Sequence, residues 1–258
     1  MPRASEITDQ VLSYVLPTQE NLFAELSAST RLEDVGKGRQ GAVLAKLDGT
    51  AGVPLVRTTT RYAGPTRRFQ PVHERLARQI QEHAATPTAF NNALIEKYTN
   101  AYTKMGSHSD QALDLADESF IAVFSCYRNP EAEATPPRKL IFESKTKSGE
   151  TFEIPLTHHG FVTFSVDANR RLKHKIVLDA PAERADNEWL GVTFRTSKTI
   201  IRFHDGHAYL PGGPRLTPAD EEQSAEFYRL RRRENNETDF HYPPLTYTLS
   251  ESDLLPPT

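Results

Sequence analysis

The sequence predicts a mainly β (α+β) fold: a double-stranded β-helix (jelly roll) with flanking helices and a C-terminal helical arm. After Phe90, seven short segments rich in β-branched and aromatic residues follow one another, separated by turns, a pattern typical of barrels and sandwiches. The chain has 258 residues, 37% of them hydrophobic, which is enough for one sizeable core. We therefore expect one barrel domain with extensions.

Residues 1–50 are expected to form an entry segment, because they carry no strong hydrophobic period. Within them, a short strand near Val11 and a short amphipathic helix from Leu22 to Leu26 are the only candidate elements. The barrel domain is expected over residues 51–210, and a C-terminal helix with a Pro-rich arm over residues 211–258.

Residues 54–70 begin the barrel domain with a β-branched, basic stretch that Gly64 and Pro65 interrupt, so we predict a strand followed by a loop. Residues 71–83 follow as a helix. Val72, Leu76 and Ile80 recur at intervals of four, and this spacing places an apolar stripe against the core. The seven predicted strands then cover residues 93–95, 119–125, 139–142, 151–154, 160–164, 174–178 and 190–194.

The C-terminal segment starts with a Gly/Pro-rich break at residues 211–214. We predict a helix with Thr217 as its N-cap and Pro218 at its first position, since acidic residues follow at 220–222 and arginines lie near its end at 229–233. The Pro-rich residues beyond it are predicted to be an ordered arm or a partly disordered tail.

Composition excludes several classes of protein. Cys126 is the only cysteine, so no internal disulfide forms and a reducing compartment, cytoplasmic or nuclear, is expected. No apolar run is long enough to cross a membrane, so a soluble protein is expected. The net charge of −3 and the pI of about 6.3 give no overall attraction to polyanions, so any nucleic-acid binding would depend on local basic patches.

His108, Ser109 and Asp110 form the most informative motif. In an extended strand, residues two apart lie on the same face, so the imidazole and the carboxylate can share one metal ion. His174 follows after 63 intervening residues in a predicted strand, and the mouth of a jelly roll can bring all three side chains together. Two histidines and one carboxylate form the facial triad of non-haem Fe(II) oxygenases, which leaves positions open for a co-substrate and O2.

The region from about Pro54 to Phe203 resembles the AlkB-like Fe(II)/2-oxoglutarate dioxygenases. Besides the metal motif and His174, the residues that carry the resemblance are 90–98, 125–128, 138–142 and 159–162. The resemblance implies that His108, Asp110 and His174 bind Fe(II), with 2-oxoglutarate and O2 as co-substrates. It also implies oxidative removal of alkyl groups from nucleic-acid bases, in which hydroxylation of an N-methyl group releases formaldehyde.

The resemblance is less regular at the co-substrate end. Members of the family carry an R-x5-R pair, and Arg195 fits its second arginine, but Trp189 stands in the place of the first. Alternatively, Arg195 and Ser197 resemble the R-x-S pair of related oxygenases, with Arg202 further on. Both registers select Arg195 for a carboxylate of 2-oxoglutarate. Tyr98 is expected to bind the same carboxylate, and Glu96, which replaces a common asparagine, must point away or pair.

A nucleic-acid substrate would be single-stranded or have its target base flipped out, held by phosphate contacts and base stacking. Residues 54–70 occupy the region of the substrate lid in the family that the chain resembles. The candidate substrate residues are Arg57, Arg61, Tyr62, Arg67, Arg68 and Arg138, with Phe69 as a further stacking residue. Two alternatives remain: the same oxygenase chemistry on a small molecule, nucleotide or protein side chain, and a non-catalytic jelly-roll binding module.

Overall fold

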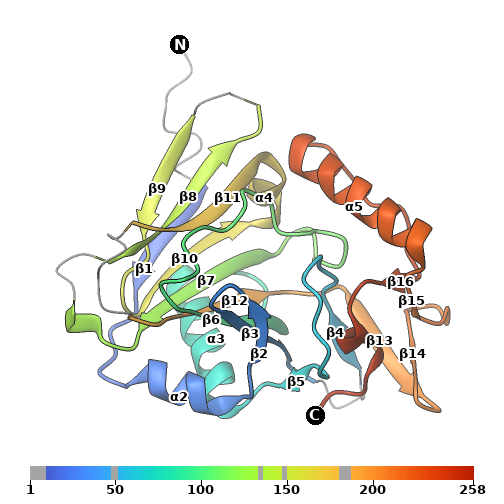
Figure 1. Ribbon diagram of the computed structural model, residues 1–258, viewed down its shortest axis with the longest axis horizontal. Helices are drawn as coiled ribbons and strands as arrows, with labels where there is room; N and C mark the ends of the chain where they lie inside the picture. The colour runs from blue at the N-terminus through green and yellow to red at the C-terminus, as the bar shows by residue number, and fades with distance from the viewer. Residues whose placement is uncertain (1–9, 48–51, 133–135, 147–149, 180–186) are drawn as a thin grey trace.

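The computed structural model describes residues 10–47, 52–132, 136–146, 150–179 and 187–258. The fold is mainly β, with antiparallel sheets and few helices (Figure 1). The large sheet has the strand order β1-β10-β7-β12-β6-β3-β2, and the short strand β5 pairs with β3. Its strands are β1 (Val11–Val15), β2 (Glu33–Gly36), β3 (Arg39–Ala45), β5 (Arg67–Arg68), β6 (Asn92–Tyr98), β7 (Phe120–Tyr127), β10 (Gly160–Ser165) and β12 (Trp189–Arg195).

A small sheet packs against the large one in the order β11-β8-β9. It consists of β11 (Leu172–Leu178), β8 (Arg138–Ser144) and β9 (Thr151–Pro155). Residues 104–108 extend it beside β11 through bridges of Lys104 with Val177 and of His108 with His174. From β6 onward, the chain passes back and forth between the two sheets, with β6, β7, β10 and β12 in the large one. This connectivity is a double-stranded β-helix, so the predicted fold class is confirmed.

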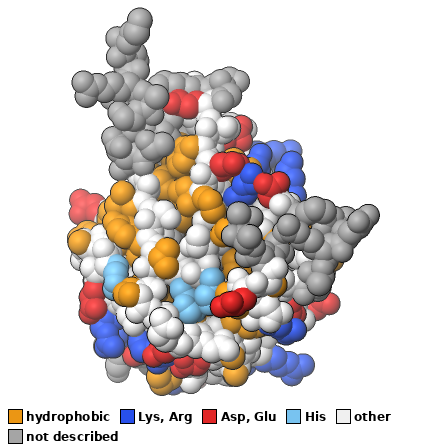
Figure 2. Space-filling model, turned by 90° about the vertical axis from the view of Figure 1, so that its left-hand side faces the viewer, with side chains coloured by type: hydrophobic (Ala, Val, Ile, Leu, Met, Phe, Trp, Pro, Cys, Tyr) orange, Lys and Arg blue, Asp and Glu red, His pale blue; other side chains and the backbone are white. Residues whose placement is uncertain are grey.

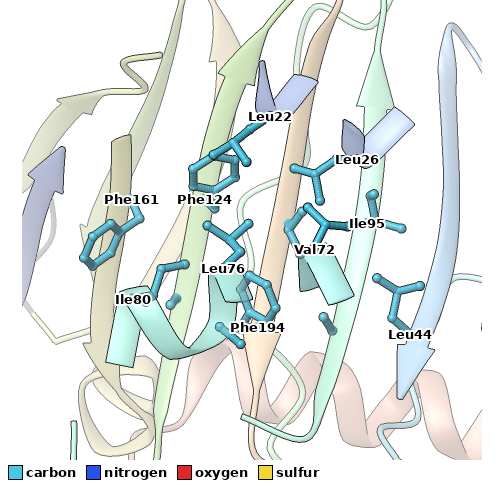
Figure 3. Close-up of a cluster of buried hydrophobic side chains, with 14 of the residues drawn as sticks. Leu22, Leu26, Leu44, Val72, Leu76, Ile80, Ile95, Phe124, Phe161 and Phe194 are labelled. Atoms are coloured by element: carbon cyan, nitrogen blue, oxygen red, sulfur yellow. The ribbon is translucent and has the colours of Figure 1, made fainter. Parts of the chain in front are cut away.

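The outer face of the large sheet is covered by α2 (Leu22–Ser29) and α3 (Pro71–Ala84). Figure 3 shows Leu76 and Ile80 of α3 packed among aromatic side chains of the sheet, among them Phe124 and Phe194. In β12, the alternate residues Leu190, Val192 and Phe194 all face this core, as the period of two requires. The apolar stripe predicted for α3 is confirmed.

The other residues of β12 face the small sheet, and this inner layer contains the site. Trp189 packs there with Leu140 and Ile176 of the small sheet. The registers of β3, β6, β12 and β7 set side chains into rows across the inner face. One row holds Arg39, Tyr98, Trp189 and Tyr127, and the next holds Gly41, Glu96, Gly191 and Ser125.

The remaining elements lie around the barrel. A sheet of β4 (Val53–Leu55), β13 (Thr199–His204) and β14 (His207–Tyr209) lies at one side, and α4 (Val166–Arg171) connects β10 to β11. The C-terminal segment contains β15 (Thr217–Pro218), α5 (Glu221–Asn236) and β16 (Tyr247–Thr248). Two short 3-10 helices are η1 (Pro130–Ala132) and η2 (Glu251–Leu254).

All seven predicted strands are present, and so are the N-terminal strand and helix. The predicted start of the C-terminal helix was wrong. Asp220 is the N-cap, because its carboxylate accepts from the Gln223 amide while the Gln223 side chain bonds back, whereas Thr217 and Pro218 pair with β16. The residues after α5 form an ordered arm rather than a tail, since Phe240, Leu245 and Leu249 pack against the helix.

The predicted domain boundary at residue 50 lies in 48–51, outside the described residues, and β3 of the expected entry segment pairs with β6 of the barrel. Within the described ranges, no helix is long and apolar enough to span a membrane. On the face that Figure 2 shows, acidic and basic side chains are mixed around exposed hydrophobic ones, so that face presents no field of a single sign.

Candidate metal centre

His108, Asp110 and His174 meet at the open end of the space between the two sheets. Their ligand atoms all lie within 4.8 Å of one another. Asp110 Oδ1 is 3.7 Å from His108 Nε2 and 3.5 Å from His174 Nε2. One ion can therefore contact all three side chains, and two imidazoles with one carboxylate are a donor set that suits Fe(II). The sequence-predicted triad is brought together.

The backbone around the triad fixes these positions. His108 and His174 exchange backbone hydrogen bonds across the edge of the small sheet, with N···O distances of 2.9 and 2.6 Å. Asn169 of α4 accepts from the Asp110 amide and donates to the Asp110 carbonyl, both at 2.8 Å. Asn235 of α5 accepts from the Ser109 amide at 2.9 Å. Three separate elements thus hold the short loop that carries the motif.

The protonation states favour metal binding. Burial, the neighbouring His174 and Arg231 lower the pKa of His108 to about 3, although Asp110 opposes this, so its imidazole is neutral at physiological pH. His108 Nδ1 lies 2.8 Å from the Gly106 carbonyl, which only accepts, so Nδ1 carries the proton and the lone pair of Nε2 is available for a metal ion.

Asp110 is kept ionised by Arg195. Burial alone would raise the pKa of Asp110, but the Arg195 guanidinium and His174 hold it well below its usual range. Arg195 Nε donates to Asp110 Oδ2 at 2.7 Å, and a second guanidinium nitrogen lies at 2.7 Å from the same oxygen. This leaves Oδ1, the oxygen nearest both imidazoles, to face the metal position.

A cavity of about 340 Å³ opens from the triad into the space between the sheets. The inner-face residues of β12, namely Trp189, Gly191, Thr193 and Arg195, line one wall in sequence order. Leu140 and Ile176 of the small sheet line the opposite wall. Residues 58–60 and Arg231 of α5 also line the cavity. The cavity therefore combines a metal-binding end with walls that carry both apolar and polar side chains.

Trp189 stands at the position of the first arginine of the R-x5-R pair. Its side chain is only 1% exposed, and its indole N–H donates to Ser125 Oγ at 2.7 Å. The ring extends over Gly191, where any Cβ would overlap it, so glycine leaves the space that the indole fills.

Glu96 forms an ion pair, as expected for a carboxylate at this position. Its partner is Arg39, which the sequence did not indicate as a site residue. Arg39 Nε donates to Glu96 Oε1 at 2.6 Å, and the Tyr98 hydroxyl donates to Glu96 Oε2 at 2.7 Å. Arg39 comes from β3, next to β6, and its NH2 also donates to Thr60 Oγ1 at 3.2 Å. Glu96 and Arg39 both line the cavity.

Three arginines line the cavity, and each is already paired with a carboxylate. Arg39 pairs with Glu96, and Arg195 with Asp110. Arg231 donates to Glu234 Oε2 at 3.0 Å, and Glu234 also accepts from the Ala112 amide. Among the described residues that line the cavity, no arginine is left with an uncompensated charge.

The other expected co-substrate residues lie elsewhere. The Tyr98 hydroxyl is committed to Glu96, and Tyr98 does not line the cavity. Ser197 is buried and donates to the Leu55 carbonyl at 2.5 Å. Arg202 is exposed on β13, away from the triad. Arg195 alone of this group lies at the cavity, and it faces the metal end.

Half of the expected substrate residues are buried. Arg57 is 4% exposed and bound to Asp114, Tyr62 is 3% exposed, and Arg138 donates to the Thr99 and Tyr102 carbonyls. Phe69 lies in the core under α3. These four side chains make structural contacts in the interior, so the expectation that they contact substrate is corrected. Arg61, Arg67 and Arg68 remain at the surface.

Sequence reasoning missed Arg39, Asn169 and Asn235, and it placed Arg231 only within a basic cluster. Arg39 lies on β3, two strands from β12, and becomes part of the site only through sheet register. The two asparagines have a weak signal, because each lies near the end of a helix whose other face is apolar. The sequence gives no sign that these helix ends touch the motif loop.

No family model matches this chain, and no curated protein is similar to it in sequence. Among solved structures, OsALKBH1 is similar over 62% of this chain and 78% of its own, at 13% identity and a TM-score of 0.41. A prolyl-4-hydroxylase from Pseudomonas putida is similar over 75% of this chain and 98% of its own, at 14% identity and a TM-score of 0.42. At this level of similarity, what the chain does must be argued from its own site.

Proposed function

We propose that this protein is a non-haem Fe(II) oxygenase that consumes O2 and a 2-oxo acid. The observation that carries the proposal is the His108–Asp110–His174 cluster at the mouth of a cavity inside a double-stranded β-helix. The expected co-substrate by resemblance is 2-oxoglutarate. In the overall reaction, the 2-oxo acid loses CO2 and becomes a carboxylic acid that takes one oxygen atom, while a substrate C–H bond becomes C–OH with the other.

The residues around the metal position have separate roles in the proposed reaction. His108 and His174 supply nitrogen donors, and Asp110 supplies the negative charge of the triad. Bound Fe(II) would supply the capacity to chelate the 2-oxo acid and to activate O2. Arg195 orients Asp110 by occupying its other oxygen. Trp189 and the apolar residues Leu140 and Ile176 of the small sheet line the cavity beyond the metal position.

For the oxidised substrate, the finer proposal is an N-alkylated base in nucleic acid. Hydroxylation of an N-methyl group gives a hemiaminal that loses formaldehyde without a further catalytic residue. The support on this chain is that Arg61, Arg67 and Arg68 stay at the surface, with Arg61 directly after residues 58–60, which line the cavity. The burial of Arg57, Tyr62 and Arg138 favours the alternative, a small molecule or protein side chain.

The test is turnover with Fe(II), ascorbate and a panel of 2-oxo acids, with methylated oligonucleotides and free methylated nucleosides as substrates. We expect CO2 release that requires Fe(II) and is lost in His174→Ala. Formaldehyde should appear with the oligonucleotide if the substrate proposal holds. Absence of CO2 release with every 2-oxo acid, in protein that binds Fe(II), would favour the non-catalytic binding module.

A further inference from the structure

We infer, building on the proposed function, that the co-substrate is a 2-oxo acid with a single carboxylate and an apolar side chain. The Glu96–Arg39 ion pair selects this acid against 2-oxoglutarate. The inference concerns the inner end of the cavity, which the side chain of a 2-oxo acid enters when its oxo and carboxylate groups face the triad.

The first step concerns the positive charge that a second carboxylate needs. A buried carboxylate is stable only beside a donor that compensates its charge, and arginine is suited to this role. On β12, the strand that carries Arg195, the inner end is occupied by Trp189, whose only polar atom already donates to Ser125. β12 therefore offers no cation at the inner end.

The second step concerns Arg39, the cavity arginine away from the triad. Glu96 Oε1 accepts from its Nε at 2.6 Å, and Thr60 accepts from its NH2. Glu96 is itself fixed, since Tyr98 donates to its other oxygen and its side chain is only 8% exposed. A second carboxylate at Arg39 would lie beside Glu96, and two carboxylates on one guanidinium repel each other.

The third step concerns the walls. Leu94 and Val123 of the large sheet and Leu140 and Ile176 of the small sheet line the cavity with Trp189. Apolar surface of this kind stabilises an alkyl side chain by removing it from water, whereas it gives a second carboxylate no compensating charge. The polar side chains that also line the cavity, such as Tyr102, Gln111 and Thr193, are not cations. The charge balance and the apolar lining thus favour the same ligand.

The reaction remains balanced with such an acid. The 2-oxo acid R–CO–COO⁻ gives R–COO⁻ and CO2, a two-electron oxidation, and the substrate C–H becomes C–OH, a second two-electron oxidation. O2 accepts the four electrons, and its two atoms enter the two products. The chemistry at the triad needs only the oxo group and the adjacent carboxylate, so the second carboxylate of 2-oxoglutarate is dispensable.

The test uses Trp189, the only tryptophan of the chain, as a built-in reporter of the inner end. Fe(II)-loaded protein under anaerobic conditions is titrated with 4-methyl-2-oxopentanoate, pyruvate or 2-oxoglutarate, and the change in tryptophan fluorescence gives each dissociation constant without turnover. We expect 4-methyl-2-oxopentanoate to bind at least about tenfold more tightly than 2-oxoglutarate, the effect of one unfavourable charged contact.

The variant Glu96→Gln then tests whether the Glu96–Arg39 ion pair selects the co-substrate. The substitution removes the negative charge but keeps the shape, so it frees Arg39 for the second carboxylate of 2-oxoglutarate. We expect affinity for 2-oxoglutarate to rise about tenfold while that for 4-methyl-2-oxopentanoate stays within about twofold. The matched control is Glu25→Gln, which removes an exposed carboxylate paired with Arg75 on the outer helices and should change neither constant.

The outcomes separate the two proposals. If wild-type protein binds 2-oxoglutarate as tightly as the apolar acid, the co-substrate inference is overturned while the proposed function stands. If no 2-oxo acid changes the fluorescence or is consumed, the proposed function fails with it. If Glu96→Gln does not fold, as a thermal melt would show, the comparison of acids in wild-type protein still decides the inference.

Discussion

At the scale of single residues, Asp110 joins the metal position to the rest of the fold. Its Oδ1 faces both imidazoles, its Oδ2 is held by Arg195, and its backbone is bonded on both sides to Asn169. Because each of these bonds uses a different atom, the carboxylate has one orientation available. Preorganisation of this kind is what a metal ligand needs, since the cost of ordering it is met when the protein folds.

Asp110→Asn is predicted to weaken Fe(II) binding by at least about tenfold, since a neutral amide loses the charge that balances the metal ion while keeping its size. Anaerobic calorimetric titration with Fe(II) measures the change. Asp117→Asn is the matched control, because Asp117 is exposed and pairs with Arg170 outside the cavity. Unchanged Fe(II) affinity in Asp110→Asn would contradict the assignment of this carboxylate as a ligand.

Asp253, in η2, provides a second prediction at this scale. Burial, together with the nearby Asp114, raises the pKa of Asp253 to about 7, although a hydrogen bond from Thr248 and the charge of Arg57 oppose the rise. Between the unfolded-state pKa, about 4 for an aspartate, and about 7, the folded state holds a proton that the unfolded state has lost. Folding stability therefore falls as the pH rises through this interval.

The measurement is the free energy of unfolding at pH 5 and pH 8 for wild type and Asp253→Asn. The amide cannot titrate, so the variant should gain stability relative to wild type as the pH rises, by about 3 kcal/mol between pH 5 and pH 8. Comparing the two proteins cancels the titration of all other groups. A constant difference between them at both pH values would show that Asp253 ionises normally.

At the scale of elements, short apolar segments bounded by turns were enough to predict strands such as β7 and β12, because both are buried on both faces and rich in β-branched and aromatic residues. The same reasoning missed β2 and β3. Their sequences contain charged residues, and the turn between them depends on Gly36, Lys37 and Gly38, all with positive φ. Tertiary pairing with β6, rather than local propensity, makes β3 a strand.

The candidate site, like the strands, was predictable where its signal is local in the sequence. The triad was predicted because His108 and Asp110 form a local motif and His174 lies in a segment whose residues predict a strand. Arg57 and Arg138 were predicted to contact substrate, because an arginine in a sequence is usually accessible and the partners that bury these two are distant. Asp114 lies 57 residues from Arg57, and no local pattern predicts their contact. Burial of a charge depends on such a partner, and only the fold supplies it.

The Arg57–Asp114 pair connects the start of the barrel domain to the C-terminal arm. Asp114 is fully buried and accepts from the Arg57 amide and guanidinium, and Arg57 NH1 donates to the carbonyls of Leu245 and Tyr247. Asp114→Ala is predicted to destabilise the protein by about 3–5 kcal/mol, because it leaves the guanidinium buried without a counter-charge.

Urea denaturation measures this loss as a lower midpoint at unchanged slope, and limited proteolysis should cut the arm after Phe240 more rapidly. Asp117→Ala removes an exposed carboxylate of the same type and should lower stability by less than about 1 kcal/mol. A midpoint for Asp114→Ala equal to that of the control would mean that the arm is held by its apolar contacts alone.

At the scale of the whole molecule, the question is whether the surface can hold a polyanion. The net charge is −3, and the three cavity arginines are neutralised by carboxylates, so long-range attraction is absent. Of the arginines first expected in the substrate lid, Arg61, Arg67 and Arg68 stay at the surface, and Arg67 donates to Thr258. Nucleic-acid binding therefore depends on very few phosphate contacts.

This gives the prediction for the substrate class. If Arg67 and Arg68 contact phosphates of a single strand, log K for binding of a methylated oligonucleotide falls linearly with the logarithm of the salt concentration. The double variant Arg67→Ala/Arg68→Ala then makes this slope shallower by about 0.7 for each lost phosphate contact, or about 1.4 in all. Fluorescence anisotropy from low to physiological salt measures both slopes. Arg78→Ala on α3 is the matched control, because this exposed arginine lies on the helix that covers the outer face of the large sheet. If the double variant has the same slope as wild type, or if no oligonucleotide binds at low salt, the lid has no role in holding nucleic acid. That outcome would favour a small molecule or a protein side chain as the oxidised substrate.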